Sequence, residues 1–297
     1  MDLQQLVYFS KVAEFQNISK AAEVLYVTQP ALTRAIKKLE EELDCPLFQR
    51  RGKALVLTEN GKLLQQRAQE LMQMMRNVKN EVGALNSNKR QIVTVQLRCI
   101  FGLFMDVLGR FMKENPDIEF RVLQDDDSGI NFGDYDLLLF PTSNPVQSRS
   151  REILLKEEVF IAMSDADPLA QKAELKVEDL QGHPYVSIGE KRMFYQTTST
   201  HRKQLRFPVE ITAYCDGMTA VRNLVRDWGY VSQMPQYTWS KTDLSGITLR
   251  PLSDARLYRY VCMTWNGDTH MNQATKQFKN YLYQYLAERE LLYRHKL

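Results

Sequence analysis

Apolar residues recur at helical spacing through the first 45 residues and predict three short helices around one small core. A hairpin pattern follows over residues 47–50 and 54–57, with a turn at residues 51–53. Residues 58–61 then open a long helix that is expected to run to about residue 85. The apolar positions of the short helices are Leu3, Leu6, Phe9, Val12 and Ala13, then Ala21, Ala22 and Leu25, then Leu32, Ile36, Leu39 and Leu43.

The pattern changes after the polar break at residues 86–88. Short apolar runs at 92–97, 118–123, 135–140 and 159–163 alternate with helical patterns, which is typical of an α/β domain. We therefore expect a helical head over residues 1–60, a linker helix and hinge over 61–88, and an α/β body over 89–297.

Residues 17–40 predict two helices that meet at a tight turn, the geometry of a helix-turn-helix. Ser19 is expected to cap the first helix and Thr28 the second, with Pro30 just inside it. The apolar stripe of the second helix faces inward, so its polar side faces outward near the N-terminus. The residues expected on that outward side are Thr28, Gln29, Pro30, Thr33, Arg34 and Lys37.

Such an outward face fits the major groove of DNA. Gln29 has the groups to bond an adenine edge, and Arg34 those to bond guanine or phosphate. Arg50, Arg51 and Lys53 at the hairpin tip are placed as a basic wing that would hold backbone phosphates. The acidic run at residues 40–42 must then point away from the duplex. The plainer alternative is a helical module whose charged face is only solvated.

The spacing of this segment resembles the N-terminal winged helix-turn-helix of LysR-type transcriptional regulators. The resemblance covers about the first sixty residues and implies double-stranded DNA as a partner. One departure is Asp44, where the family usually has a glycine that closes the recognition helix. The matching positions are Ala21, Ala22, Leu25, the run 27–32, Ile36, Leu39, Glu40, Leu43, the run 46–48, Arg50, Leu57, Thr58 and Gly61.

The long helix carries an apolar seam at alternating steps of four and three residues, the period of a two-helix coiled coil. We expect a homodimer through this seam, which would bring two heads to two half-sites. The alternative is an amphipathic helix that packs on its own domain. The family resemblance implies the same linker helix and often a tetramer. The seam residues are Leu64, Ala68, Leu71, Met75, Val78, Val82 and Leu85.

In the body, a strand, a helix and a second strand open an α/β unit over residues 92–123. Ligands bind beyond the carboxyl ends of such strands, so Arg98, Cys99, Ile100, Phe101 and Gln124 are the first candidates. Arg98 and the free N–H groups of the following helix start could hold a carboxylate, although a solvated arginine is as plausible a reading.

The family resemblance extends into the body more weakly. It implies a two-lobed α/β effector domain similar to periplasmic solute-binding proteins, so the expected fold class is α plus α/β. Lobe I would cover about 89–162 and 266–297, and lobe II about 163–265. A small molecule of unknown identity would sit in the cleft, and two departures from the family pattern, at 125–133 and at Trp228 and Tyr230, leave it open. The implied effector residues are Cys99, Ile100, Phe101, Phe140, Ser187, Tyr214, Cys215 and Asp216.

Composition adds limits rather than a function. The 297 residues carry a formal net charge of only +3, so a nucleic-acid site must be a local basic patch. The four cysteines and four histidines are scattered, so no metal site or cofactor is expected, and no pattern of the peroxide-sensing relatives surrounds Cys99 or Cys215. No membrane span or signal peptide is evident, and the cytoplasm is the expected location.

The sequence thus favours a LysR-type regulator, with RNA polymerase as an open partner. The rival is an enzyme or a solute-binding protein built on the same two-lobed fold. Against an enzyme, the chain has no glycine-rich phosphate loop, no GxSxG motif and no acid/base pair at a telling spacing.

Overall fold

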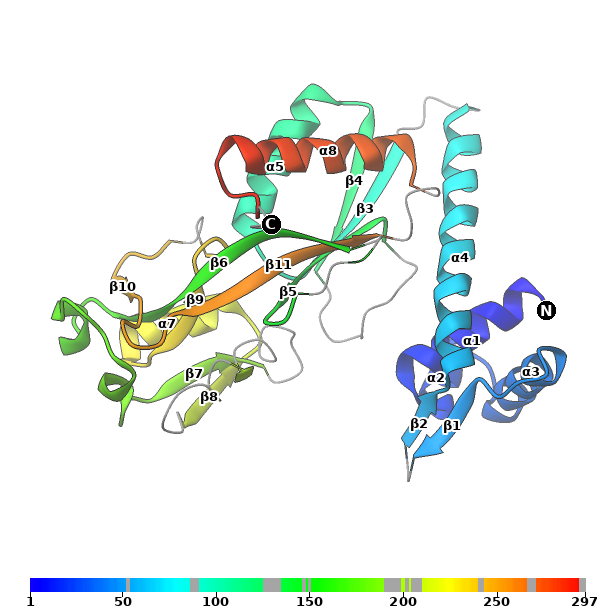
Figure 1. Ribbon diagram of the computed structural model, residues 1–297, viewed down its shortest axis with the longest axis horizontal. Coiled ribbons are helices and arrows are strands. Elements are labelled where there is room, and N and C mark those ends of the chain that lie inside the picture. Colours follow the sequence, from blue (N-terminus) through cyan, green and yellow to red (C-terminus); the bar gives the residue numbers. More distant parts are fainter. Residues whose placement is uncertain are drawn as a thin grey trace. The chain divides into compact units, whose positions relative to one another are not determined.

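The computed structural model describes residues 1–51, 54–85, 91–124, 135–145, 148, 151–189, 199–200, 203, 210–239, 243–265 and 271–293. The chain divides into two compact units (Figure 1). The first is built mainly on Met1–Lys89, and the second contains Arg90–Asp127, Leu137–Trp265 and Gln273–Leu297. Among the helices of the described ranges, none is both long and apolar enough to cross a membrane.

Three helices and a hairpin form the first unit, as the sequence pattern predicts. The helices are α1 (Leu3–Phe15), α2 (Ile18–Val24) and α3 (Gln29–Glu42), and the hairpin is β1 (Phe48–Arg51) with β2 (Ala54–Leu57). The long helix α4 (Glu59–Leu85) follows. Phe9, Val12, Ala21, Leu32 and Leu39 are fully or almost fully buried and form the shared core.

The caps of the two central helices differ in how well the sequence predicted them. Thr28 caps α3, because its hydroxyl accepts a hydrogen bond from Ala31 N at 3.4 Å, and Pro30 lies in the first turn. The prediction that Ser19 caps α2 is wrong. Asn17 is the cap, and its side-chain oxygen accepts a hydrogen bond from Lys20 N at 3.1 Å. The helix starts earlier than Ser19 because the longer Asn side chain already satisfies the first turn.

The end of α3 also differs in detail from the sequence pattern. Leu32, Ile36 and Leu39 face the core as expected, but Leu43 lies beyond the last helical residue and is partly exposed. Asp44 adopts a left-handed backbone with φ of 49°, at the position where a glycine would be more comfortable. The helix α3 therefore ends at Glu42, one residue before the last position of the predicted apolar stripe.

A close backbone approach joins the start of α4 to the hairpin. Gly61 lies against the Leu47 carbonyl oxygen, and a Cβ at Gly61 would overlap that oxygen and the Leu57 side chain. The same carbonyl accepts a hydrogen bond from Thr58 N at 3.0 Å. The first turn of the long helix is thereby fixed to the base of the wing.

One large sheet forms the framework of the second unit. The strands are β3 (Gln91–Leu97), β4 (Ile118–Leu123), β5 (Leu137–Thr142), β6 (Arg151–Ser164), β9 (Ser232–Pro235), β10 (Ile247–Arg250) and β11 (Leu257–Trp265). Their order is β10-β6-β11-β5-β3-β4, with β9 also paired to β6. β3 is parallel to β4 and β5, whereas β11 is antiparallel to both β5 and β6.

The strand at 159–163 is longer than the sequence predicted, since β6 begins at Arg151. β11 falls within the stretch that the sequence analysis assigned to lobe II. Its residues Tyr260 to Trp265 nevertheless pair with β5, which belongs to lobe I. These two long strands therefore run through both parts of the body, as Figure 1 shows.

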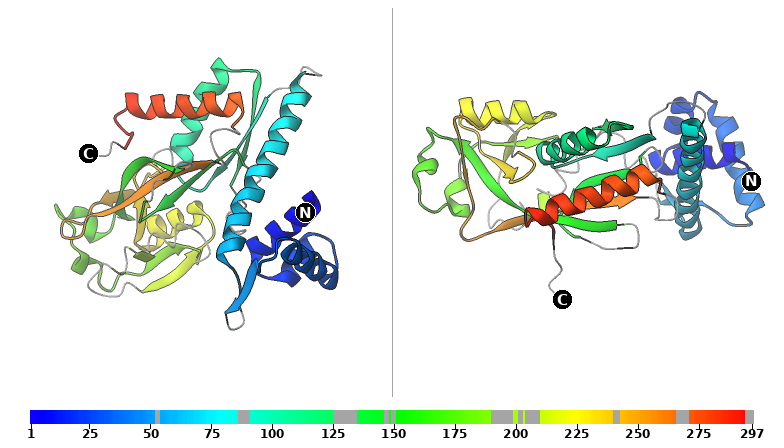
Figure 2. Two further views of the ribbon diagram at one scale, coloured as in Figure 1. Left: turned by 45° about the vertical axis from the view of Figure 1, so that its right-hand side comes forward. Right: turned by 90° about the horizontal axis from the view of Figure 1, so that it is seen from above.

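Helices cover the sheet on either side of the long strands. α5 (Phe101–Glu114) and α8 (Gln273–Glu288) lie beside one another in both views of Figure 2, joined by edge-on contacts of Phe104 and Phe111 with Phe278. The other part contains a small parallel sheet of β7 (Tyr185–Ile188) and β8 (Ile211–Cys215), two short 3-10 turns, η1 (Pro168–Gln171) and η2 (Val177–Leu180), and α7 (Met218–Trp228).

Two glycine substitutions should have opposite effects on stability. Gly61→Ala should destabilise the first unit by roughly 1–3 kcal/mol, since the Leu47 backbone cannot move aside. Gly109→Ala, at an exposed position of α5 with open space around its Cβ, should stabilise the second unit by about 0.5–1 kcal/mol.

Chemical denaturation of the intact protein measures both effects. The three tryptophans, at 228, 239 and 265, report on the second unit alone, whereas far-ultraviolet circular dichroism reports on both units. A Gly61→Ala protein that unfolds at the wild-type midpoint by circular dichroism would contradict the close approach.

Candidate functional site

The outward side of α3 is polar and mostly exposed. Gln29, Pro30, Arg34 and Lys37 are exposed, and Thr33 is half-buried. Thr28, the cap, is also exposed. The six residues that the sequence selected therefore lie together on one face at the start of this helix, as a helix with a buried 32/36/39 stripe requires.

Local hydrogen bonds order this face before any partner binds. The Thr33 hydroxyl donates to the Gln29 backbone oxygen at 2.9 Å, and Arg34 Nε donates to the Pro30 oxygen at 3.4 Å. The Ser19 hydroxyl of α2 donates to the Gln29 side-chain oxygen at 3.2 Å. Arg34 and Lys37 bring positive charge to the exposed side of the helix.

The wing is fastened to α3 by a residue that the sequence analysis treated only as part of an acidic run. Glu40 Oε1 accepts hydrogen bonds from Leu47 N at 2.7 Å and from Phe48 N at 3.2 Å. A carboxylate that bonds two backbone N–H groups holds them more strongly than a neutral acceptor would. Glu40 thus turns toward the hairpin, whereas Glu41 and Glu42 are exposed and Glu42 pairs with the N-terminal amine.

Of the predicted wing cations, Arg50 is exposed on β1. Arg51 ends β1, and its backbone pairs with Ala54. Lys53 lies outside the described residues.

The predicted seam of α4 divides into two parts. Leu64 packs against the core of the head and Ala68 is fully buried within the single chain, so the alternative of packing on its own domain holds for the first turns. Leu71, Met75 and Val78 are about half exposed, with Met75 at 50%, and Val82 is equally exposed. Leu85 is the last residue of the helix.

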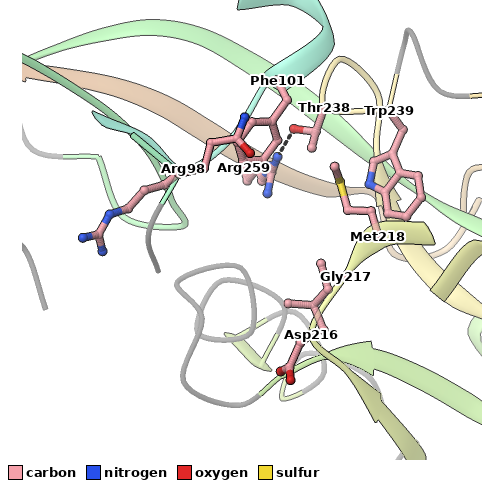
Figure 3. Close-up of a pocket in the computed structure, with 10 residues that line it drawn as sticks. Arg98, Phe101, Asp216, Gly217, Met218, Thr238, Trp239 and Arg259 are labelled. Atoms are coloured by element: carbon pink, nitrogen blue, oxygen red, sulfur yellow. Dashed lines mark hydrogen bonds between the residues drawn. The ribbon is translucent and has the colours of Figure 1, made fainter. Parts of the chain in front are cut away.

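A cavity of about 350 Å³ opens in the second unit where α5 and α7 begin (Figure 3). Its wall combines apolar side chains with a few charged and polar ones, the composition usual for small-molecule sites. Because both helices begin at this cavity, their N-terminal dipoles favour negative charge there. The lining residues are Arg98, Phe101, Gln124, Ile188, Asp216, Gly217, Met218, Thr238, Trp239 and Arg259.

A buried ion pair forms the floor of this cavity. Arg259 Nε donates to Glu157 Oε1 at 2.6 Å, and both side chains are almost completely buried. Glu157 Oε2 also accepts a hydrogen bond from Tyr237 N at 2.9 Å. Thr238 accepts hydrogen bonds from Arg259 and, at 3.1 Å, from Ile100 N. Glu157 thus neutralises the charge of Arg259. Removing either partner would leave a buried charge unpaired and would destabilise the protein.

This network changes one sequence prediction about the start of α5. The N–H of Ile100 is not free for a carboxylate, because Thr238 accepts it. Ile100 also has a left-handed backbone with φ of 49°, a strained conformation for a β-branched residue. Arg98 lines the cavity but is only 7% exposed, so it is not the solvated arginine of the alternative reading.

Four of the ten predicted effector residues line the cavity. Arg98, Phe101, Gln124 and Asp216 line it, and Cys99 and Ile100 are buried beside it. Phe140, Ser187, Tyr214 and Cys215 are not among its lining residues. Side chains alternate along a strand, so Ile188 rather than Ser187 faces the cavity from β7, and Phe140 is buried on β5.

The sequence analysis missed Gly217, Met218, Thr238, Trp239 and Arg259. They lie at the start of α7, after β9 and on β11, far apart along the chain. A buried arginine within an apolar strand was the one local signal that could have indicated Arg259.

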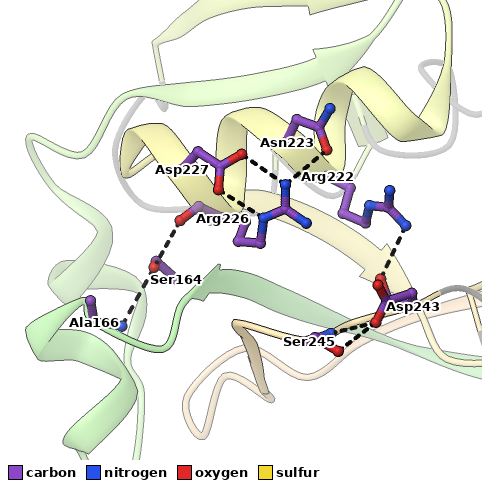
Figure 4. A network of polar contacts seen from close by, with 8 residues as sticks. All are labelled: Ser164, Ala166, Arg222, Asn223, Arg226, Asp227, Asp243 and Ser245. Carbon is purple, nitrogen blue, oxygen red and sulfur yellow. Dashed lines mark hydrogen bonds and ion pairs between the residues drawn. The ribbon is translucent and has the colours of Figure 1, made fainter.

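The far end of α7 is anchored by polar contacts (Figure 4). The Ser164 hydroxyl donates to the Arg226 backbone oxygen at 3.0 Å, and Arg222 donates to the Asp243 oxygen at 3.2 Å. Arg226 also bonds both oxygens of Asp227, at 2.7 and 2.9 Å, which lowers the pKa of that carboxyl. The helix that opens onto the cavity is therefore held from β6 and from the loop before β10.

The cysteines near the cavity have the character of structural thiols. Burial raises the pKa of Cys262 to about 11, and burial together with the Asp216 charge raises the pKa of Cys215. Cys99 is buried. Since the thiolate is the reactive form, these surroundings disfavour peroxide chemistry at neutral pH.

Comparison with known proteins assigns both units of the chain. Residues 3–62 match the family model described as bacterial regulatory helix-turn-helix protein, lysR family, and residues 94–287 match the LysR substrate binding domain. The chain is 26% identical over 294 residues to the uncharacterised HTH-type transcriptional regulator YybE of Bacillus subtilis, covering 97% of this chain and 100% of that protein.

Solved structures show the same fold over nearly the whole chain. Full-length OxyR from Pseudomonas aeruginosa matches with a TM-score of 0.58 and 22% identity, covering 95% of this chain and 94% of that one. Full-length CbnR, solved in complex with its target DNA, matches with a TM-score of 0.53 and 17% identity, covering 96% of this chain and 99% of that one.

Proposed function

This chain belongs to the LysR family of DNA-binding transcriptional regulators, and we propose that a small molecule in the cavity of its effector-binding domain controls how its head occupies promoter DNA. Family members are transcriptional regulators rather than enzymes. The observation that carries the proposal is the cavity itself, which has two helix starts, an aromatic wall and a buried ion pair at one place.

The head binds DNA through α3 in the major groove. Gln29 and Arg34 reach base edges, while Thr28, Thr33 and Lys37 contact the neighbouring backbone. Arg50, Arg51 and Lys53 on the wing hold phosphates beside the groove. The exposed polar face of α3 and the firm attachment of the wing through Glu40 support this arrangement.

A second copy of the chain covers the exposed half of the α4 seam. Four apolar side chains from Leu71 to Val82 are half exposed at steps of four, three and four residues, which is the spacing that a coiled-coil partner fills. Two heads on one twofold axis then grip two half-sites, and linkage multiplies the weak contact of one head. A tetramer and contact with RNA polymerase stay open beyond the dimer.

The effector is a small molecule with an apolar body. Phe101, Met218 and Trp239 offer it apolar surface, and Asp216 and the Arg259–Glu157 pair fix its polar groups. Binding between the starts of α5 and α7 favours one separation of the two parts of the body over another. That difference in conformation is what the heads respond to.

Two substitutions in the head separate base reading from phosphate binding. Arg34→Ala should reduce discrimination between the native operator and a scrambled duplex by about 1–3 kcal/mol. Arg50→Ala should weaken both duplexes alike and lower the slope of log affinity against log salt by about 0.9 per lost phosphate contact. Titrations of both variants over a range of salt concentrations test this, and full discrimination by Arg34→Ala would remove base reading from Arg34.

Two neighbouring methionines of α4 provide a matched test of dimerisation through the seam. Met75→Asp should give a monomer that still folds but loses tight binding to a full operator, because two carboxylates would meet in the seam. Met74→Asp, on the same helix but off the seam, should remain dimeric. Analytical ultracentrifugation and operator titration measure both properties. A dimeric Met75→Asp protein with normal binding would move the dimer interface to another surface.

Filling the cavity tests the effector site. Gly217 lines the cavity, its backbone is extended, and a Cβ there meets nothing within 4 Å, so the backbone tolerates a side chain and Gly217→Trp should fill part of the cavity. Native mass spectrometry of protein purified from its host should find a bound small molecule in the wild type and in the control Gly109→Trp, and none in Gly217→Trp. The same added mass in all three proteins would mean that the ligand binds elsewhere.

A further inference from the structure

Ser19 and Gln29 make a side-chain contact between the two helices of the helix-turn-helix. The Ser19 hydroxyl oxygen lies 3.2 Å from the Gln29 side-chain oxygen, although the residues are ten positions apart. Ser19 is the second residue of α2 and Gln29 is the first residue of α3. The contact therefore crosses the turn and ends on the helix that faces DNA.

The Ser19 hydroxyl has no local task that would explain this contact. Asn17 caps α2, with its side-chain oxygen on Lys20 N, so Ser19 is not needed for the helix start. An exposed serine in the first turn would otherwise be solvated. The Ser19 hydroxyl instead donates to Gln29 on the neighbouring helix α3.

Gln29 is thereby held at two points. Its backbone oxygen accepts the Thr33 hydroxyl at 2.9 Å, and its side-chain oxygen accepts the Ser19 hydroxyl. A glutamine side chain on an exposed helix start normally samples several rotamers, and fixing it before binding removes that entropy cost. Neither of these two hydrogen bonds uses the amide –NH2 group of Gln29.

We propose that Ser19 is a positioning residue for base reading, which sets the Gln29 amide so that its –NH2 group points toward the bases as a donor. The inference rests on the proposed insertion of α3 into the major groove. With its oxygen turned toward Ser19, Gln29 donates its –NH2 group to acceptors on the base edges, namely N7 and O6 of guanine, O4 of thymine or N7 of adenine. The bidentate contact with adenine also requires the Gln29 oxygen to accept from N6. That oxygen has a second lone pair but is turned toward Ser19 of α2, so adenine is disfavoured relative to guanine and thymine.

The test compares four full-length proteins: the wild type, Ser19→Ala, Gln29→Ala and the double variant. Each selects binding sites from a random-sequence duplex library, and affinities are then measured for duplexes with every base at each position of the selected half-site. Ser19→Ala should alter base preference by roughly 3- to 10-fold at the base pair whose preference Gln29→Ala removes, and nowhere else. At that base pair adenine should gain, since the Gln29 oxygen is released.

The double variant should behave as Gln29→Ala alone, since Ser19 acts only through Gln29. Ser19→Thr keeps the hydroxyl and should retain the wild-type preference. The thermal melting of Ser19→Ala should stay near that of the wild type, because the Asn17 cap is intact and alanine suits a helix.

Three results would overturn the inference. Equal weakening of all duplexes by Ser19→Ala would make Ser19 a phosphate contact. Additive effects of the two substitutions would show that Ser19 and Gln29 act independently. Unchanged base preference in Gln29→Ala would remove the residue that Ser19 is proposed to position. The proposed reading of bases by α3 fails only if Arg34→Ala also leaves base preference unchanged, so failure of the Ser19 inference and failure of that part of the proposed function are distinguishable.

Discussion

The head of this regulator depends on the backbone of a single residue, Leu47. Its N–H is bound by Glu40 from α3, and its carbonyl oxygen accepts Thr58 N and lies against Gly61 at the start of α4. Its side chain is buried in the core of the head. The helix α3, the hairpin and the start of α4 therefore all contact one peptide segment.

This junction accounts for the position of Glu40 near the C-terminal end of α3. Glu40 would repel phosphates if it were exposed, yet turned toward the hairpin it satisfies two backbone N–H groups that no strand partner reaches. The charge that opposes DNA binding in the sequence is used inside the head to hold the wing. β1 begins at Phe48, so the same attachment also positions Arg50 on that strand.

How much the sequence could predict follows from the range of each interaction. The helices, the Thr28 cap and the outward face of α3 were predictable because a 3.6-residue period and a cap depend on residues within one or two turns. Ser19 and Asn17 compete as caps two residues apart, and only the geometry of the turn decides between them. Thr238 carried no local signal, and the arginine within the apolar strand β11 marked Arg259 as unusual without showing which cavity it reaches, because their partners in space lie far away in sequence.

The pairing of β6 with β11 sets the order in which the chain folds during synthesis. The backbone contacts at the Leu47 junction are local, since they join Leu47 to Glu40, Thr58 and Gly61. Glu157 and Arg259, by contrast, are 102 residues apart. β6 cannot pair with β11, its neighbour in the large sheet, until β11 has left the ribosome. Local contacts form early and distant strand pairs late. A nascent chain thus carries a finished DNA-binding head for as long as it takes to translate about a hundred further residues beyond β6.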